Sequence, residues 1–304
     1  MLLGAHPDAC TVGELKGASR GNPDTYCCSC GARIRECGFW QKISAAMLAR
    51  GYTYEVTSAG TDIKAVAGRY AQRLLRPLQR TAGLERVRDA LLNLSPDWRA
   101  HLLRTQARNA ALVETLQEVS GARVVIDSSK TGLRLKYLLR NSALEVRVIR
   151  LLRDGRGVSL THTNPGEFAD ASAPHLRSGG TGGPGHTGLS MQEAASLWKD
   201  SNAEADRITT TLGPAQCLTI RYEELCATPA KTMRAVCEFL DLDPFDPGTN
   251  FRARKQQHVV GNGMRMDASS EIRHDERWRT HLTPEQLNVF NEVAGVLNRR
   301  YGYG

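Results

Sequence analysis

The sequence predicts an α/β fold with a mostly parallel β-sheet flanked by helices. Short apolar runs at 123–127, 146–152 and 217–222 have the length and composition of strands in a buried parallel sheet. Segments with helix-start signals separate these runs, and strands that alternate with helices favour a parallel sheet. The length of 304 residues suits one large α/β domain, which we expect to span 1–304.

The remaining elements follow in chain order. Residues 20–38 are rich in glycine, proline, cysteine and arginine and predict an irregular segment, whereas the alternating run 52–58 predicts a strand. Ser95-Pro96, Ser190–Glu193 and Thr283–Gln286 are helix-start signals. Helices are expected at about 39–51, 64–82, 97–119, 130–141, 190–212, 228–240 and 283–300. The glycine-rich stretch 163–189 predicts a long flexible loop, which would either border the acceptor pocket or be a plain disordered insertion.

The net charge of +8 indicates an anionic partner, either a nucleic acid, an acidic surface or a phosphorylated or sulfated small molecule. The basic residues are spread along the chain, which argues against a nucleic-acid-binding arm. No apolar stretch is long enough to span a membrane, and the first residues lack the pattern of a signal peptide. We therefore expect a cytoplasmic protein with no membrane span.

Four of the eight cysteines, Cys27, Cys28, Cys30 and Cys37, crowd into one short segment. In a cytoplasm they should be reduced. Their spacing is not the paired C-x-x-C form and no fourth ligand is obvious, so zinc binding and simple packing of an irregular loop both remain open. We predict no metal site.

Two strand ends carry residues suited to anion binding. Ser128, Ser129 and Lys130 follow the run 123–127 where a helix should begin, and helix N-termini attract anions. The alternative is a serine N-cap with a solvated lysine. Arg153-Asp154-Gly155-Arg156-Gly157 follows the run 146–152, and arginine suits phosphate because its planar fork donates two parallel hydrogen bonds. The alternative there is an ordinary glycine turn with exposed arginines.

Together these segments resemble the sulfotransferases that use 3′-phosphoadenosine 5′-phosphosulfate (PAPS). The Arg-Asp-Gly-Arg-Gly turn is similar to the family's 3′-phosphate element, in which an arginine and a hydroxyl eight positions later hold the phosphate. Further similar segments are Ala5–Asp8 with Gly13–Leu15, the cysteine cluster ending in Phe39-Trp40, Ile220–Leu225, His258–Arg265 and Ile272–Trp278. The order and spacing suit bacterial and tyrosylprotein sulfotransferases and imply a P-loop-NTPase-like fold.

The resemblance implies a role for each matching residue. Glu14 is the candidate catalytic base, and Lys130 would stabilise charge on the bridging oxygen, assisted by Ser129. Arg153 and Thr161 would bind the 3′-phosphate. Gly261, Asn262 and Arg265 would cover the nucleotide. PAPS would be the co-substrate and PAP (3′-phosphoadenosine 5′-phosphate) the product. The acceptor would be a hydroxyl or an amine on a carbohydrate, a lipid, a phenolic metabolite or a peptide.

Members of this family open with a strand and a Gly-Arg-Ser-Gly-Ser/Thr-Thr loop that holds the 5′-phosphosulfate. That loop should lie just before His6-Pro7, but Met1–Leu3 match the helix that follows it. We therefore expect the first strand and the phosphate loop to be missing, through a start assigned too far downstream, a truncated gene or true loss.

Three other functions compete with this interpretation. A nucleotide kinase would require Gly-x-x-x-x-Gly-Lys-Ser/Thr, which the sequence lacks. A non-catalytic relative would bind PAP or a partner without transferring a sulfuryl group. A basic nucleic-acid-binding module would show steeply salt-dependent binding, but no such motif is present.

Overall fold

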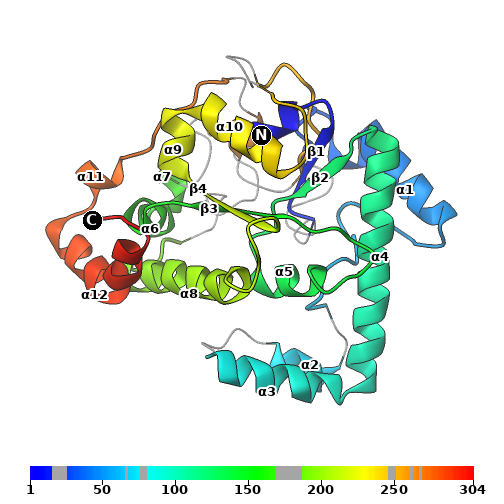
Figure 1. Ribbon diagram of the computed structural model, residues 1–304, viewed down its shortest axis with the longest axis horizontal. Coiled ribbons are helices and arrows are strands. Elements are labelled where there is room, and N and C mark those ends of the chain that lie inside the picture. Colours follow the sequence, from blue (N-terminus) through cyan, green and yellow to red (C-terminus); the bar gives the residue numbers. More distant parts are fainter. Residues whose placement is uncertain are drawn as a thin grey trace.

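The strands form two parallel pairs in the computed structural model (Figure 1), which describes residues 1–15, 26–65, 68–75, 81–168, 187–245, 251–259, 263–266 and 269–304. Strand β1 (Ala9–Gly13) pairs with β2 (Val124–Asp127), and β3 (Val148–Leu152) pairs with β4 (Cys217–Arg221). In these residues no hydrogen-bonded strand joins β2 to β3. The three strands expected from apolar runs and their parallel direction are confirmed.

Two strand assignments need correction. Strand β1 was not predicted, because its sequence Ala-Cys-Thr-Val-Gly carries little of the usual strand composition although all five residues are buried. The predicted strand 52–58 is wrong, since only an isolated bridge between Glu55 and Ser58 forms there. Its alternating side chains Tyr54 and Val56 are buried in a hydrophobic core without a sheet partner, which accounts for the misleading pattern.

Most predicted helices are confirmed, and their caps follow the sequence signals. The hydroxyl of Ser95 accepts from the backbone N–H of Trp98, and capping boxes open the helices after Ser190 and Thr283. The longer helices are α1 (Gly38–Ala49), α4 (Pro96–Ser120), α5 (Gly132–Leu138), α6 (Gly155–Thr163), α8 (Met191–Thr209), α10 (Pro229–Phe239) and α12 (Pro284–Arg300). Short helices are α7 (Pro165–Phe168), α9 (Tyr222–Ala227) and α11 (Trp278–His281).

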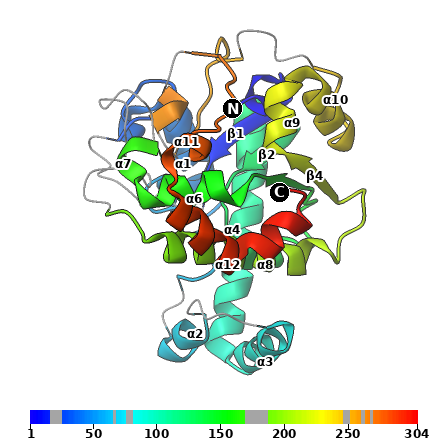
Figure 2. The same cartoon turned by 90° about the vertical axis from the view of Figure 1, so that its left-hand side faces the viewer.

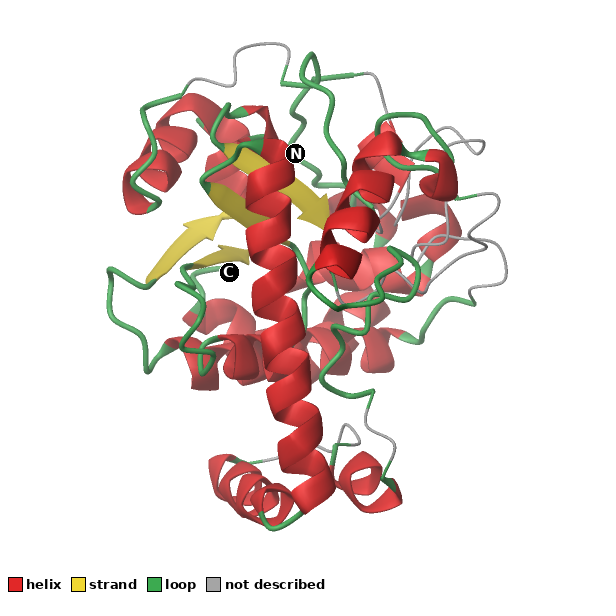
Figure 3. Ribbon diagram, turned by 90° about the vertical axis from the view of Figure 1, so that its right-hand side faces the viewer, coloured by secondary structure: helices red, strands yellow, loops and turns green. Residues whose placement is uncertain are grey.

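The region between α1 and α4 differs from the expectation of one helix at 64–82. It contains α2 (Arg69–Leu74) and an unpredicted helix α3 (Ala82–Asn93), which Thr81 caps through the N–H of Leu84. Figure 3 shows α4 crossing the molecule, with α2 and α3 at its amino end, away from the strands. The expected loop 163–189 begins with the helical residues of α7, and 169–186 lie outside the described residues.

Two large cores support the strand ends. One packs β1 against α1 and α4, with Trp40, Ile43 and Leu112 among its most buried side chains. The other joins α6, α8 and α12 around Trp198 and Phe290, and Figure 2 shows these helices side by side. In the described residues, no helix is long and apolar enough to cross a bilayer.

Candidate active site

Asp127 connects the ends of the adjacent strands β1 and β2. Its Oδ1 accepts hydrogen bonds from the backbone N–H of Leu15 at 3.3 Å and from that of Ser129 at 2.9 Å. Its Oδ2 accepts from the Arg134 guanidinium, with Nη2 at 2.8 Å and Nε at 2.9 Å. One carboxylate therefore fixes the turns after both strands.

Arg134 is the buried counter-ion of this carboxylate. Its side chain, on α5, is 4% exposed. It also donates to the Thr61 carbonyl at 2.8 Å and to the Asn109 side chain at 2.9 Å. Burial of a charge is tolerated when it is both paired and hydrogen-bonded, as here. The Asp127–Arg134 pair thus anchors the turns to the helices behind them.

The two predicted catalytic residues lie together at these turns. Glu14 follows β1 and Lys130 follows β2, and the distance from Glu14 Oε1 to Lys130 Nζ is 2.9 Å. The lysine side chain is 81% exposed and the glutamate side chain 22% exposed, so a ligand in solvent can reach the lysine directly. The pair therefore places a proton acceptor, the Glu14 carboxylate, next to a cation, the Lys130 ammonium.

The segment around Val259 lies against β1. The backbone N–H of Val259 donates to the Val12 carbonyl, and its carbonyl accepts from the Glu14 N–H at 3.3 Å. Gly13 has φ of +82°, and a Cβ there would collide with the Val259 carbonyl oxygen. Glycine is required because it alone tolerates both this conformation and this close approach. The contact fixes the backbone of Glu14.

Arg265 is buried, and its guanidinium lies over the Tyr26 ring, 4.7 Å from the ring centroid. This places it near the cysteine-rich segment. The predicted nucleotide contacts Gly261 and Asn262 lie outside the described residues.

The second group of site residues surrounds Arg153 at the carboxyl end of β3. Its Nη2 lies 2.8 Å from Asp275 Oδ2, and its guanidinium stacks over Tyr222 with 4.6 Å to the ring centroid. The Tyr222 hydroxyl in turn accepts from the Asp275 backbone N–H. Hydrogen bonds from Arg277, against the opposing effect of burial and with help from Arg153, hold the pKa of Asp275 well below its usual range.

Thr161 lies on the same side of α6 as Arg153. A Cβ at Gly157 would sit 3.4 Å from the Arg153 guanidinium, so the arginine covers Gly157. Thr161 is four residues further on, and residues at this spacing share a helix face. Its hydroxyl donates to the Val158 carbonyl at 2.7 Å and keeps its oxygen as an acceptor. Thr161 is thus one helical turn beyond the glycine that Arg153 covers, although it does not line the pocket beside Arg153.

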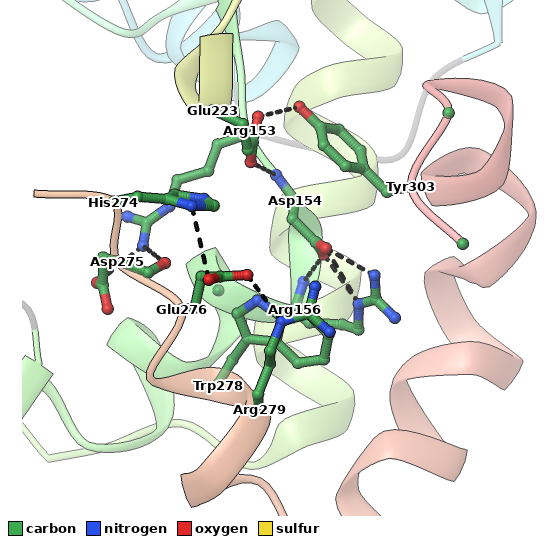
Figure 4. A pocket seen from close by; sticks show the side chains of 13 residues that line it. Arg153, Asp154, Arg156, Glu223, His274, Asp275, Glu276, Trp278, Arg279 and Tyr303 are labelled. Carbon is green, nitrogen blue, oxygen red and sulfur yellow. Dashed lines mark hydrogen bonds and ion pairs between the residues drawn. The ribbon is translucent and has the colours of Figure 1, made fainter. Parts of the chain in front are cut away.

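Asp154 and Arg156 form the start of α6. Asp154 caps the helix by accepting from the Arg156 N–H, and the two side chains form an ion pair at 2.7 Å. The Arg156 guanidinium also stacks on Trp278 with 4.0 Å to the ring centroid. These residues, Arg153 and Asp275 line a pocket of about 200 Å³ that Glu14 and Lys130 do not line (Figure 4).

Two histidines near the motifs differ in their surroundings. The ring of His6 is held at both nitrogens, by the Asp8 N–H and the Asp243 carbonyl, which supports a structural role. His162 is half-buried beside Thr161, and burial lowers its pKa.

Three residues of the site went unassigned in the sequence, namely Asp127, Tyr222 and Asp275. An aspartate as the last residue of an apolar strand was a usable signal for Asp127. Tyr222 and Asp275 lay in segments that matched the resemblance, but nothing local indicated that they would contact Arg153.

Comparison with known proteins identifies the family of this chain. The model described as "Sulfotransferase family" matches residues 53–247, and that described as "Sulfotransferase domain" matches residues 201–301. Since the first match spans more than half of the sequence, the chain belongs to the sulfotransferase family. No curated protein matches it.

Two similar solved structures are themselves sulfotransferase domains. One, from the Synechococcus PCC 7002 olefin synthase, is 15% identical with a TM-score of 0.46, and the match covers 94% of each chain. The other, from the curacin biosynthetic pathway, is 14% identical with a TM-score of 0.49, and the match covers 100% of this chain and 92% of that one.

Proposed function

We propose that this chain transfers a sulfuryl group from PAPS to a hydroxyl or amine acceptor. The observation that carries the proposal is the position of Arg153 at the carboxyl end of β3, over Gly157 and along α6 from Thr161. Ligands of open α/β sheets bind at the carboxyl ends of strands. A 3′-phosphate there would be recognised by the guanidinium and the threonine hydroxyl.

Phosphate binding would require Arg153 to exchange its ion pair with Asp275 for one with the phosphate. Arg153 now donates to that carboxylate, with 2.8 Å between Nη2 and Oδ2. In the proposed complex the phosphate takes this donor from Asp275, which keeps its hydrogen bonds from Arg277. The stack on Tyr222 holds the guanidinium plane during the exchange. Ser129 and Arg265, and by resemblance Gly261 and Asn262, would contact the rest of the nucleotide.

Glu14 and Lys130 would carry the chemistry. The acceptor oxygen forms a bond to sulfur while the bond from sulfur to the 5′-phosphate oxygen breaks, which releases PAP. The acceptor proton passes to the Glu14 carboxylate, and the Lys130 ammonium stabilises negative charge on the leaving oxygen. Their ion pair at 2.9 Å must open for both to act, and the exposure of Lys130 allows this.

A titration with PAP and with AMP, which lacks the 3′-phosphate, tests the proposed donor. We expect PAP to bind more tightly than AMP. Arg153→Ala should weaken PAP binding roughly 10- to 150-fold, because a charge-assisted hydrogen bond contributes about 1.5–3 kcal/mol to the binding free energy. Arg147→Ala is the matched control. Arg147 also pairs with an aspartate, Asp241, but it lies just before the first residue of β3, at the amino end of the strand. Equal binding of PAP and AMP, or equal effects of the two variants, would exclude this role for Arg153.

Production of PAP from PAPS separates an enzyme from a non-catalytic relative. An active enzyme forms PAP at a rate that depends on the acceptor, which a screen of hydroxyl and amine compounds would identify. A relative that only binds nucleotide would show the PAP preference with no acceptor-dependent turnover.

A further inference from the structure

Three cysteine thiols converge in the segment between β1 and α1, away from the pocket beside Arg153. The Sγ atoms of Cys28, Cys30 and Cys37 all lie within 4.8 Å of one another, and those of Cys30 and Cys37 are 3.6 Å apart. Cys28 is 0% exposed and Cys37 is 2% exposed, with Cys30 partly buried. Local folding rather than chance proximity creates this cluster.

The backbone of this segment forms a tight turn that aims the thiols at one point. The Cys28 N–H donates to the Ala32 carbonyl, and the Gly31 N–H donates back to the Cys28 carbonyl. Gly31 takes a φ of +92°, a conformation that favours glycine. Cys37, at the N-cap of α1, brings the third thiol from the other side. Two ligands from a turn and one from a helix start make a small preorganised site.

A fourth candidate ligand atom comes from a residue far along the sequence, Gln257. The side-chain oxygen of Gln257, Oε1, lies 3.3 Å from the Cys28 sulfur and 3.5 Å from the Cys37 sulfur. A tetrahedral zinc ion with bonds of about 2.3 Å to sulfur and about 2.0–2.2 Å to oxygen places two sulfurs about 3.8 Å apart, and sulfur and oxygen about 3.5 Å apart. The Cys30–Cys37 separation of 3.6 Å and the two sulfur–oxygen separations are close to those edges, and all three sulfurs lie within 4.8 Å of one another.

We propose that Cys28, Cys30 and Cys37 bind one Zn²⁺ ion, with Gln257 at the fourth position. Thiolates are soft ligands that select zinc over magnesium or calcium. A site with four protein ligands is closed, which suits a structural ion. The sequence left zinc open for want of a visible fourth ligand, and the fold supplies one from a residue more than two hundred positions away.

The ion would fasten the segment 256–259 beside the candidate active site. Ser29 already donates two hydrogen bonds to this segment, from its backbone N–H to the His258 carbonyl and from its side-chain hydroxyl to the Gln256 carbonyl. The same segment then meets β1 at Val259, whose carbonyl accepts from Glu14. A metal ion bound to Gln257 would therefore hold the segment that supports the Glu14 backbone. This inference does not depend on the sulfuryl donor.

Metal analysis of the purified chain tests the proposal. Prepared with reductant and without chelator, the protein should contain one zinc per chain, measured by mass spectrometry of its metals. Cys28→Ser and Cys37→Ser should each lose most of it. Cys226→Ser, which removes a half-buried thiol elsewhere, should retain it.

Cobalt titration of the chelator-treated wild-type chain decides the question even if serine variants fold poorly. Bound Co²⁺ should give thiolate-to-metal charge-transfer absorption, and Zn²⁺ should displace it. Gln257→Leu should keep the charge transfer from three thiolates, change the visible bands that report the fourth ligand, and weaken zinc at least tenfold in competition with a chromophoric chelator. Absence of zinc and of cobalt charge transfer, or a Cys30–Cys37 disulfide in the metal-free protein, would overturn the proposal.

Discussion

Glu14 and Lys130 form an ion pair with 2.9 Å between Oε1 and Nζ, although 115 residues separate them in the sequence. Their contact follows from the pairing of β1 and β2, because Gly13 lies opposite Asp127 and both charged side chains come just after these strand ends. A pair so exposed on the lysine side adds little stability, about 0–1 kcal/mol. Its position at the carboxyl ends of two strands favours a role in binding or catalysis.

The first prediction separates activity from stability at this pair. Glu14→Gln removes the proton acceptor and should reduce turnover about 10²- to 10⁴-fold, the usual contribution of a general base. Lys130→Met should also reduce turnover. Both variants should unfold in urea within about 0.5 kcal/mol of wild type, since surface pairs contribute little. PAP affinity of Glu14→Gln should stay near that of wild type.

Glu118→Gln provides the control for this prediction, because Glu118 also pairs with a cation, Arg50, but on the α1–α4 side of the molecule. It should leave turnover unchanged. Unchanged turnover in Glu14→Gln as well would remove Glu14 from the role of base.

The second prediction concerns Asp127, which we regard as a positioning residue. Asp127→Asn would leave Arg134 buried without its counter-ion and should lower the free energy of unfolding by about 2–3 kcal/mol, less than the 3–5 kcal/mol for a fully buried pair because Asp127 is partly exposed. Turnover should fall as well, since the carboxylate fixes the turns that carry Glu14 and Lys130. Urea unfolding and steady-state rates measure the two effects.

Asp62→Asn is the matched control, since Asp62 accepts a backbone N–H from Lys64 in the same local geometry but faces no buried arginine. It should change unfolding by less than about 0.5 kcal/mol, as typical of surface substitutions. A similarly small effect of Asp127→Asn would show that Arg134 does not need this partner.

The sequence predicted the parallel strands and most helices because those signals are local. Apolar runs identified β2, β3 and β4, and a serine followed three residues later by glutamate identified the start of α8. Strand β1 was not predicted because its small residues Ala9 and Gly13 have low strand propensity, although they allow close packing. The run 52–58 misled because burial of Tyr54 and Val56 on one side imitates the alternation of a strand.

Site residues were predictable from the sequence only where their position relative to a predicted strand indicated a role. Arg153 and Lys130 follow strands, so their position could be inferred, whereas the partner Asp275 lies 122 residues beyond Arg153. Gln257 near the cysteines is a similar case, 220 residues from Cys37. Such partners are fixed by the tertiary fold, which local patterns do not encode. The expected absence of the first strand and phosphate loop stays a prediction, and so do the nucleotide contacts of Gly261 and Asn262.

The third prediction uses two glycines with the same backbone conformation. Gly13 and Gly51 both have φ of +82°, but only a Cβ at Gly13 would meet other atoms. Each alanine variant should lose about 1–2 kcal/mol from the left-handed conformation. Gly13→Ala should lose a further 1–3 kcal/mol, roughly the penalty of overpacking, and should weaken PAP binding because Val259 moves. Equal urea midpoints for the two variants would show that the Val259 contact yields without strain.

The last prediction concerns the pH dependence of stability through His162. Burial lowers the pKa of this ring below 6.5, its ordinary value in an unfolded chain. As pH falls through 6.5 toward the lower pKa of the folded state, the unfolded chain gains a proton that the folded chain does not. The unfolded state is then favoured, so the contribution of His162 to stability is present above pH 6.5 and declines on acidification.

His162→Gln removes this titration while keeping a polar side chain beside Thr161. Urea unfolding of wild type and variant at about pH 8 and about pH 5.5 should show wild type losing stability relative to the variant at the lower pH, because only wild type takes up the proton on unfolding. A constant difference between the two proteins at both pH values would mean that the ring is hydrated enough to titrate alike in the folded and unfolded states.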